Sequence, residues 1–334
     1  KAEDIYAQVI KDAKDAIAKL KAPQKFPQSG HASKGSATML LADVYMTQHK
    51  YAEAVTLLES LSGMGYQILP DYSAVFSTSN KNNRESIFEV QYMQGVQGGL
   101  QSNFIYKFLP RTLDTKIITG VTTNTSTVGG WNTPTDDLIA SYEPGDKRLD
   151  ASIGIVEGAY NASDLFVYSA DKSIIGYTPA PGKIGIPYTR KFQHPSETSN
   201  NTDDNWPVYR YSDALLLLAA ALNEQGKGPE ALPYVNRVRS RAGLAEIGTT
   251  GKEELRKIIL HERRVELAFE DHRWFDLLRT GNAIEVMNAY GKVMKSTYKY
   301  LNPASYNVTK DRLVYPIPES EMGLNTLLTQ NPGY

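Results

Sequence analysis

Cysteine, long apolar runs and an excess of basic residues are all missing from this 334-residue chain. Without cysteine there can be no disulfide, thiolate metal ligand or cysteine nucleophile. The apolar run Leu215–Leu222 falls far short of the roughly 20 residues that a membrane-spanning helix requires. Lys and Arg number 36 against 37 Asp and Glu, so no general basic field is available for binding nucleic acid.

The chain begins at Lys1, without Met and without a charged-then-apolar leader. We therefore expect a processed or truncated product, from which an export signal or a lipid-anchor cysteine would be missing. Hydrophobic residues make up 41% of the chain, which is enough for a packed core and too many for a disordered protein.

Helical periodicity dominates both ends of the sequence. Apolar residues at helical spacing predict amphipathic or buried helices over Glu3–Leu20, Lys34–Gln48, Tyr51–Leu61, Leu255–Phe269, His272–Arg279 and Ala283–Tyr290. The alternating segment Ile87–Tyr92 predicts a strand. The end of the chain, Leu313–Tyr334, is rich in proline and predicts an extended tail.

Two helical hairpins repeat one spacing. Leu40-Leu41-Ala42 is followed after twelve residues by Ala54, and Leu217-Leu218-Ala219 is followed after twelve residues by Ala231. This spacing resembles the tetratricopeptide repeat, in which small residues lie where two helices approach closely. Between the hairpins lies a stretch that contains 12 of the 25 glycines and only short apolar clusters.

These patterns predict a mainly α fold, in which tetratricopeptide-like helical hairpins support a large, irregular, loop-rich insert. We expect an N-terminal helical part over residues 1–91, a ligand-binding insert over 92–206, and a C-terminal helical part of the same domain over 207–334. Loops held by such a scaffold commonly carry the functional surface.

Several segments of the second half, in this order, resemble one family. They are Arg210-Tyr211-Ser212-Asp213, Asn236-Arg237-Val238-Arg239, Arg241-Ala242-Gly243-Leu244, Glu262–Glu270, His272–Leu277, Tyr315-Pro316-Ile317-Pro318 and the terminal Gln330–Tyr334. The hairpin at 34–62, Tyr66–Phe76 and Glu85–Val90 agree with the same family. The chain thus resembles the SusD/RagB family of Bacteroidetes outer-membrane lipoproteins along essentially its whole length, although family members are usually longer at the N-terminus.

The resemblance implies a cell-surface nutrient-binding protein, lipid-anchored on the extracellular face of the outer membrane. Such proteins bind glycans without catalysis and pass oligosaccharides to a SusC-like TonB-dependent transporter. Capture of oligopeptides by a RagB-like member, or a transporter lid with no ligand of its own, are the alternatives. The residues Glu262–Asp276 themselves alternate charges with apolar positions, which predicts arginine–carboxylate pairs that join neighbouring helices rather than a binding site.

No catalytic motif is complete. His261-Glu262 begins like a zinc-protease motif, but Val265 stands where its second histidine belongs. The paired acids Asp136-Asp137 follow Pro134-Thr135 and are better placed to start a helix than to cleave a sugar. We therefore expect no enzyme activity, no cofactor and no metal. A structural Ca²⁺ bound by loop carboxylates is compatible with the sequence, but no spacing predicts one.

Aromatic residues of the insert are the best candidates for a binding site. A sugar ring has an apolar face and a rim of hydroxyls, so it is bound by a flat exposed ring with polar groups around it. Trp131 lies in a turn-rich segment without hydrophobic periodicity, which predicts an exposed stacking platform, with Asn132 as a polar partner. Tyr106, Tyr160 and Tyr177 are weaker candidates, and Trp206 is expected to join the insert to the scaffold.

Overall fold

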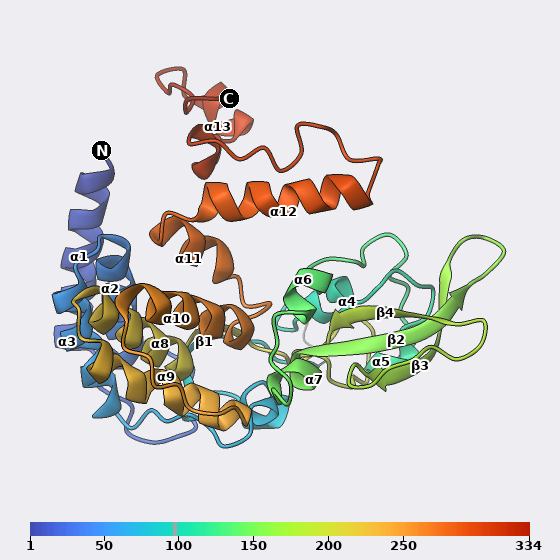
Figure 1. Ribbon diagram of the computed structural model, residues 1–334, viewed down its shortest axis with the longest axis horizontal. Coiled ribbons are helices and arrows are strands. Elements are labelled where there is room, and N and C mark those ends of the chain that lie inside the picture. Colours follow the sequence, from blue (N-terminus) through green and yellow to red (C-terminus); the bar gives the residue numbers. More distant parts are fainter. Residues whose placement is uncertain (96–98) are drawn as a thin grey trace. The chain divides into compact units, whose positions relative to one another are not determined.

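The computed structural model describes residues 1–95 and 99–334 (Figure 1). The chain forms two units, Lys1–Glu270 and Asp271–Tyr334, and each is described by itself. In the first unit the helical scaffold consists of α1 (Ala2–Lys19), α2 (Lys34–Thr47), α3 (Tyr51–Ser62), α8 (Tyr211–Glu224), α9 (Gly228–Ala242) and α10 (Lys252–Glu266). The mainly helical fold is thereby confirmed.

The scaffold forms where the helical periodicity predicts it. The Ser33 hydroxyl accepts a hydrogen bond from the Ser36 N–H and so caps the start of α2. Helix α8 is apolar nearly all round because α3, α9 and α10 pack against it. The repeated alanines are completely buried in one core shared by both hairpins: Ala42, Ala54, Ala219 and Ala231. Their lack of a long side chain permits the close helix packing predicted for them.

The insert is more regular than the sequence predicted. It contains short helices at α4 (Phe104–Phe108), α5 (Lys116–Thr119), α6 (Asp136–Ile139) and α7 (Arg148–Ser152), and an antiparallel sheet of β2 (Ile153–Tyr160), β3 (Phe166–Ser173) and β4 (Ile184–Thr189). The strand order is β3-β2-β4, as Figure 1 shows. The prediction of an irregular insert therefore missed this sheet.

A second sheet joins the insert to the scaffold. Strand β1 (Ser86–Val90), predicted from its alternation, pairs antiparallel with β5 (Trp206–Arg210). Val90 lies opposite Trp206, whose ring centroid is 5.3 Å from those of both Phe104 and Phe192. Trp206 thus packs the insert onto the end of the strand pair, as predicted.

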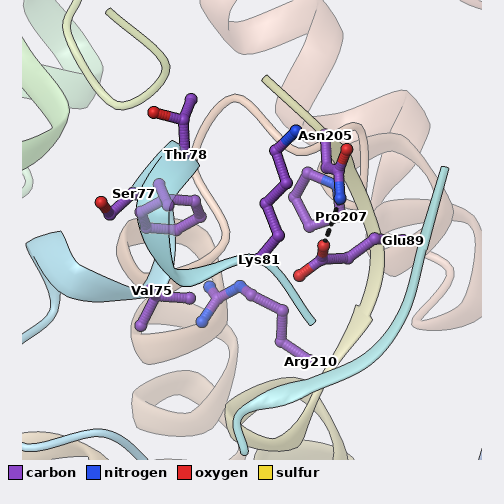
Figure 2. Close-up of a pocket in the computed structure, with 9 residues that line it drawn as sticks. Val75, Ser77, Thr78, Lys81, Glu89, Asn205, Pro207 and Arg210 are labelled. Atoms are coloured by element: carbon purple, nitrogen blue, oxygen red, sulfur yellow. Dashed lines mark hydrogen bonds between the residues drawn. The ribbon is translucent and has the colours of Figure 1, made fainter. Parts of the chain in front are cut away.

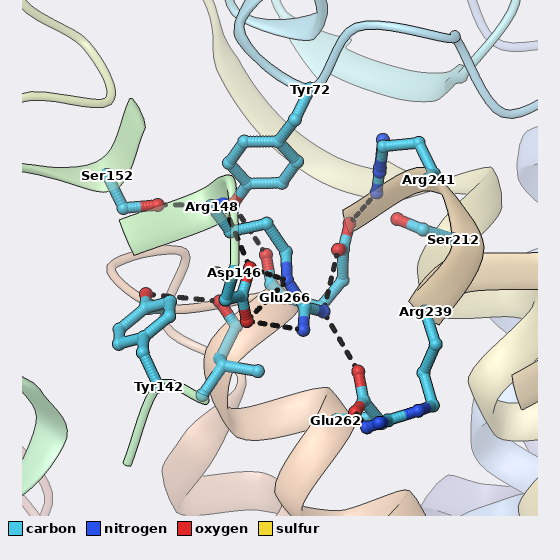
Figure 3. A network of polar contacts seen from close by, with 12 residues as sticks. Tyr72, Tyr142, Asp146, Arg148, Ser152, Ser212, Arg239, Arg241, Glu262 and Glu266 are labelled. Atoms are coloured by element: carbon cyan, nitrogen blue, oxygen red, sulfur yellow. Dashed lines mark hydrogen bonds and ion pairs between the residues drawn. The ribbon is translucent and has the colours of Figure 1, made fainter. Parts of the chain in front are cut away.

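Buried charges also connect the two regions (Figure 3). We call this group the ion cluster; its cations are Arg148, Lys191, Arg210, Arg239 and Arg241, and its carboxylates are Glu85, Asp146, Glu262, Glu266 and Glu270. Arg148 of α7 contacts Glu262 and Glu266 of α10 at 3.0 and 3.4 Å. Arginine–carboxylate pairs between elements far apart in sequence are therefore confirmed.

The second unit differs from its prediction mainly in the length of α12 and in the presence of α13. Its helices are α11 (Arg273–Arg279), α12 (Ala283–Thr297) and the short α13 (Glu319–Leu324), with a 3₁₀ turn at Asp311–Leu313. Helix α12 continues beyond the predicted end at Tyr290 and runs through Gly291. Tyr306 packs against Gly291 so closely that an added Cβ would lie 2.3 Å from the Tyr306 Cβ. Helix α13 interrupts the tail predicted as extended; Glu319 and Glu321 lie in its first turn, where carboxylates are favourable.

Helix α10 ends at Glu266, three residues before its predicted end, and left-handed backbone follows at Phe269 and Asp271 (φ 70° and 65°). Among the described residues, no helix has both the length and the apolar character needed to cross a membrane.

Candidate functional site

Trp131 is an exposed aromatic ring on a firmly held backbone. Its indole is 63% exposed, as predicted from the turn-rich segment around it. The Trp131 N–H donates to the carbonyl of Lys107 in α4 at 2.8 Å, and the neighbouring Gly130 N–H donates to the Leu109 carbonyl at 2.7 Å. Because both bonds hold the backbone against the insert core, the ring is presented to solvent in a defined position.

Two glycines make this arrangement possible. Gly130 adopts a left-handed backbone with φ 88°, which few other residues tolerate. Gly129 lies so close to the preceding chain that a Cβ would be 2.7 Å from the Leu109 carbonyl oxygen. The segment thus needs glycine twice in order to turn while staying against the core.

Asn132 anchors the other side of the loop. Its Nδ2 donates to the Phe269 carbonyl at 3.1 Å, and its own carbonyl accepts from the Thr189 hydroxyl at 2.5 Å. The side-chain amide predicted to bind sugar hydroxyls is therefore already used in part to hold the loop. Its Oδ1 forms no hydrogen bond within the described chain, so that this acceptor remains for a ligand.

Tyr106 requires a correction. Its ring is 1% exposed and packs in the core of the insert, and its hydroxyl lies 2.7 Å from the Ser196 hydroxyl. It was predicted as a stacking platform because it is an aromatic residue of the insert. Its position in α4 turns it inward instead, so no face of its ring is free for a sugar.

Tyr160 and Tyr177 lie on the three-stranded sheet. Tyr160 ends β2 and is 55% exposed, with its ring centroid 5.4 Å from that of Phe166. Tyr177 is half-buried, and its hydroxyl donates to Glu157 at 3.1 Å. Among the residues described, no hydrogen bond or ring contact joins either tyrosine to Trp131. Of the two, only Tyr160 offers a largely open ring.

Glu157 and Tyr177 affect one another's proton affinity. The backbone N–H of Ala180, with help from the Tyr177 hydroxyl, holds the pKa of Glu157 below its ordinary value. Desolvation and the neighbouring carboxylate raise the pKa of Tyr177. Glu157 is therefore an ionised hydrogen-bond acceptor, unlike a protonated catalytic acid.

Two pockets among the described residues are poorly suited to a glycan. One cavity has a volume of about 20 Å³. Figure 2 shows its lining residues, among which Asn205 donates to Glu89. Such a volume holds one water molecule rather than a sugar. A wider hollow of about 280 Å³ lies between α1 and α2. It is lined by Lys21–Lys25, Gln28, Ser29 and His31–Ser33, so no Trp, Tyr or Phe faces it. Neither of these two pockets therefore suits a stacked sugar, whereas the exposed Trp131 ring is open to one.

One group of side chains has the composition of a metal site. Ligand atoms of Glu143, His261 and Glu262 lie within 4.8 Å of one another. Arg239 lies between the two carboxylates, however, and its Nη1 donates to Glu143 at 2.6 Å and to Glu262 at 2.5 Å. Because the guanidinium already supplies the positive charge, these residues do not fit a metal ion. Burial lowers the pKa of His261, which keeps the ring neutral there.

Two basic residues at the Trp131 loop were not identified from the sequence. Lys107 accepts the Trp131 N–H through its backbone carbonyl, and Arg111 donates from Nε to the Gly129 carbonyl at 3.2 Å. They precede Trp131 by 24 and 20 residues. Neither carries a motif, and only the fold brings their backbone segment beside the loop.

The fold and the site together define a class: a helical scaffold protein that presents an aromatic side chain on a loop-rich insert. The family model described as the SusD family matches residues 84–334. The chain therefore belongs to the SusD family, as the motifs in its second half predicted.

Relatives and solved structures agree with this membership. The chain is 26% identical over 327 residues to SusD-like protein P2 of Formosa agariphila, covering 90% of this chain and 60% of that protein. It is 23% identical to the starch-binding protein SusD of Bacteroides thetaiotaomicron, covering 100% and 66% of the two chains. A laminarin-binding SusD-like protein matches with a TM-score of 0.71 and 26% identity, over 99% of this chain and 69% of that one. The chain thus spans about 60–66% of the length of these sequence relatives.

Proposed function

We propose that this protein binds glycans without catalysis at the outer surface of the outer membrane, with Trp131 as the main stacking platform. The observation that carries the proposal is the exposed indole on a backbone held by hydrogen bonds. A rigid ring binds the apolar face of a sugar with little loss of conformational entropy. Similarity to proteins described as starch-binding and laminarin-binding supports a glycan as the ligand.

The proposed role continues beyond binding. As a SusD-family member, the protein would be lipid-anchored on the extracellular face and deliver oligosaccharides to a SusC-like TonB-dependent transporter. Stacking on one open ring, with a few hydrogen bonds that compete with water, gives dissociation constants of about 1 μM to 1 mM. Such weak binding suits a protein that releases its ligand to a transporter.

Isothermal titration calorimetry with soluble starch, laminarin, other polysaccharides and mixed oligopeptides tests the proposal. We expect saturable heat with at least one glycan. Trp131→Ala should weaken that binding about 30-fold, because an aromatic ring that the ligand covers contributes about 2 kcal/mol to binding. Tyr300→Ala is the matched control, since Tyr300 is an exposed ring in the other unit.

The other outcomes separate the alternatives. Glycan binding that survives Trp131→Ala would keep the function but refute the site. Binding of peptides alone would favour oligopeptide capture. If neither glycans nor peptides give binding heat, glycan capture would be contradicted and the role of a transporter lid would be favoured. Release of new reducing ends from a bound polysaccharide would contradict the non-catalytic role.

A further inference from the structure

The Trp131 platform has cations beside it that no carboxylate neutralises. Arg111 is exposed and uses Nε to bind the Gly129 carbonyl, so its two terminal nitrogens are directed away from that bond. Within the described part of the chain, neither these nitrogens nor the Lys107 ammonium has a hydrogen-bond or ionic partner.

Both cations are close to the indole along the backbone. Lys107 is joined to Trp131 by the 2.8 Å backbone hydrogen bond. Arg111 is joined to Gly129, two residues before Trp131, and two residues of chain span at most about 7.6 Å between Cα atoms. A sugar stacked on the indole thus places its substituents, or those of the next sugar, within reach of these long side chains.

The acidic residues near this loop form no ion pair with Arg111 or Lys107. Asp137 is paired with Arg264, and the Thr135 hydroxyl caps α6 by accepting from the Leu138 N–H. Asp136 in the loop and Asp114, three residues after Arg111, form no ion pair in the residues that the structure covers. Because neither carboxylate is bound to Arg111 or Lys107, both cations remain available to an anionic ligand.

We propose that the glycan bound at Trp131 is acidic, with carboxylate or sulfate groups that Arg111 and Lys107 contact while a sugar ring stacks on the indole. The inference rests on the proposed function and adds the ligand's chemical class. A guanidinium fixed through Nε offers parallel N–H groups that match the two oxygens of a carboxylate or sulfate. The ammonium of Lys107 adds a charge without fixed geometry, which accommodates more than one position along the chain.

Matched pairs of polysaccharides that differ only in charge provide the test. Polygalacturonic acid is compared with its carboxyl-reduced form, and a sulfated galactan with its desulfated form, by calorimetry. We expect one acidic member to bind at least about tenfold more tightly than its neutral counterpart at low salt. The preference should shrink as salt rises, because exposed charges are screened. The pair of polysaccharides that shows this preference, carboxylated or sulfated, identifies the acidic group that the protein binds.

Variants assign the preference to the two cations. Arg111→Gln and Lys107→Gln should each weaken binding of the acidic glycan about fivefold, as the loss of one exposed charge contact implies. Binding of the neutral counterpart should weaken less than binding of the acidic glycan; Arg111→Gln also removes the Nε contact to the Gly129 carbonyl, so a small loss is expected there. Arg111→Lys should keep part of the preference. Arg84→Gln is the matched control, because Arg84 is an exposed arginine that also donates to a backbone carbonyl, that of Gly65.

The outcomes distinguish this proposal from the function on which it rests. Equal binding of charged and neutral forms, lost in Trp131→Ala, would overturn the acidic ligand and leave glycan capture intact. A preference for acid that survives both glutamine variants would overturn the assignment to these cations. If no glycan of either kind binds, the proposed function itself is contradicted. Thermal unfolding of each variant checks that the loop remains folded.

Discussion

Neutralising Glu266 tests whether the ion cluster holds the insert on the scaffold. Glu266 is completely buried and accepts from Arg241 at 2.6 Å, Arg210 at 3.0 Å and Arg148 at 3.4 Å. Glu266→Gln keeps the shape of the side chain but leaves the cluster with one uncompensated positive charge. Breaking a buried ion pair by removing one partner costs about 3–5 kcal/mol. We expect a loss of free energy of unfolding in that range at pH 7.

Lys191 gives the same variant a characteristic pH dependence. Burial lowers the pKa of Lys191 to about 8, although the carboxylates of Glu270 and Glu266 favour its charged form. Without the Glu266 charge, this pKa falls further. The unfolded chain keeps its lysine protonated up to about pH 10.4, so deprotonation of the folded state stabilises it as pH rises.

The size of this effect follows from the two pKa values. Between pH 7 and pH 9, a folded-state pKa of about 8 gives a gain of about 1.4 kcal/mol. A folded-state pKa that is lower still in the variant gives a larger gain over the same interval. The deficit of Glu266→Gln relative to the unmodified protein should therefore be smaller at pH 9 than at pH 7.

Urea unfolding followed by far-ultraviolet circular dichroism at both pH values measures the deficit. Glu224→Gln is the matched control, because Glu224 also accepts from basic side chains, Arg256 and Lys252, but lies nearer to solvent. That substitution should cost about 1 kcal/mol or less, without the pH effect. Equal costs for the two substitutions, or a Glu266→Gln deficit that is the same at pH 7 and 9, would refute the reasoning.

Three further predictions concern acid, the platform loop and the insert core. Burial alone would raise the pKa of Glu266, but the neighbouring arginines hold that pKa well below its usual range. The ionised carboxylate therefore stabilises the fold above about pH 4.3, and this stabilisation is lost as the pH falls below that value. The urea concentration at the unfolding midpoint should accordingly be lower at pH 3 than at pH 5. Gly129→Ala forces a Cβ to 2.7 Å from a backbone oxygen and should weaken glycan binding in calorimetry, whereas Gly248→Ala, in open space, should not. Tyr106→Phe removes the hydroxyl contact to Ser196 and should lower the free energy of unfolding by about 1 kcal/mol without changing affinity.

The helical scaffold was readable from the sequence because its signals are local. Apolar periodicity located α1, α2 and α3 to within one residue at most boundaries. The left-handed backbone that ends α10 at Glu266 had no such signal, since Phe269 and Asp271 are not glycines. Charges alternating with apolar residues in that segment correctly predicted ion pairs. The partners of these charges, such as Arg148 for Glu262, depend on the tertiary fold and could not be named.

The three-stranded sheet was missed for a related reason. Strand β2 is buried along most of its length. Its sequence is therefore a run of apolar residues and glycines, without the alternation of apolar and polar residues that is typical of a half-exposed strand. Strand β4 contains Pro187, which argues against a strand in a sequence. Only β3 alternates, with Phe166 and Tyr168 buried and Val167 exposed between them. The available signal was the turn cluster Asn161–Asp164 between two segments rich in strand-forming residues.

The candidate site shows which part of a binding surface a sequence can reveal. The turn-rich context of Trp131 was sufficient to predict its exposure, because nothing local would bury the ring. The proposed use of the ring in binding depends on its support. That support comes from the Lys107 carbonyl, 24 residues earlier, and from the Phe269 carbonyl, 137 residues after Asn132. An exposed ring on a mobile loop would lose much of its binding energy to ordering. The structure therefore strengthens the case for Trp131 through contacts that no local pattern contains, and it removes Tyr106 for the same reason.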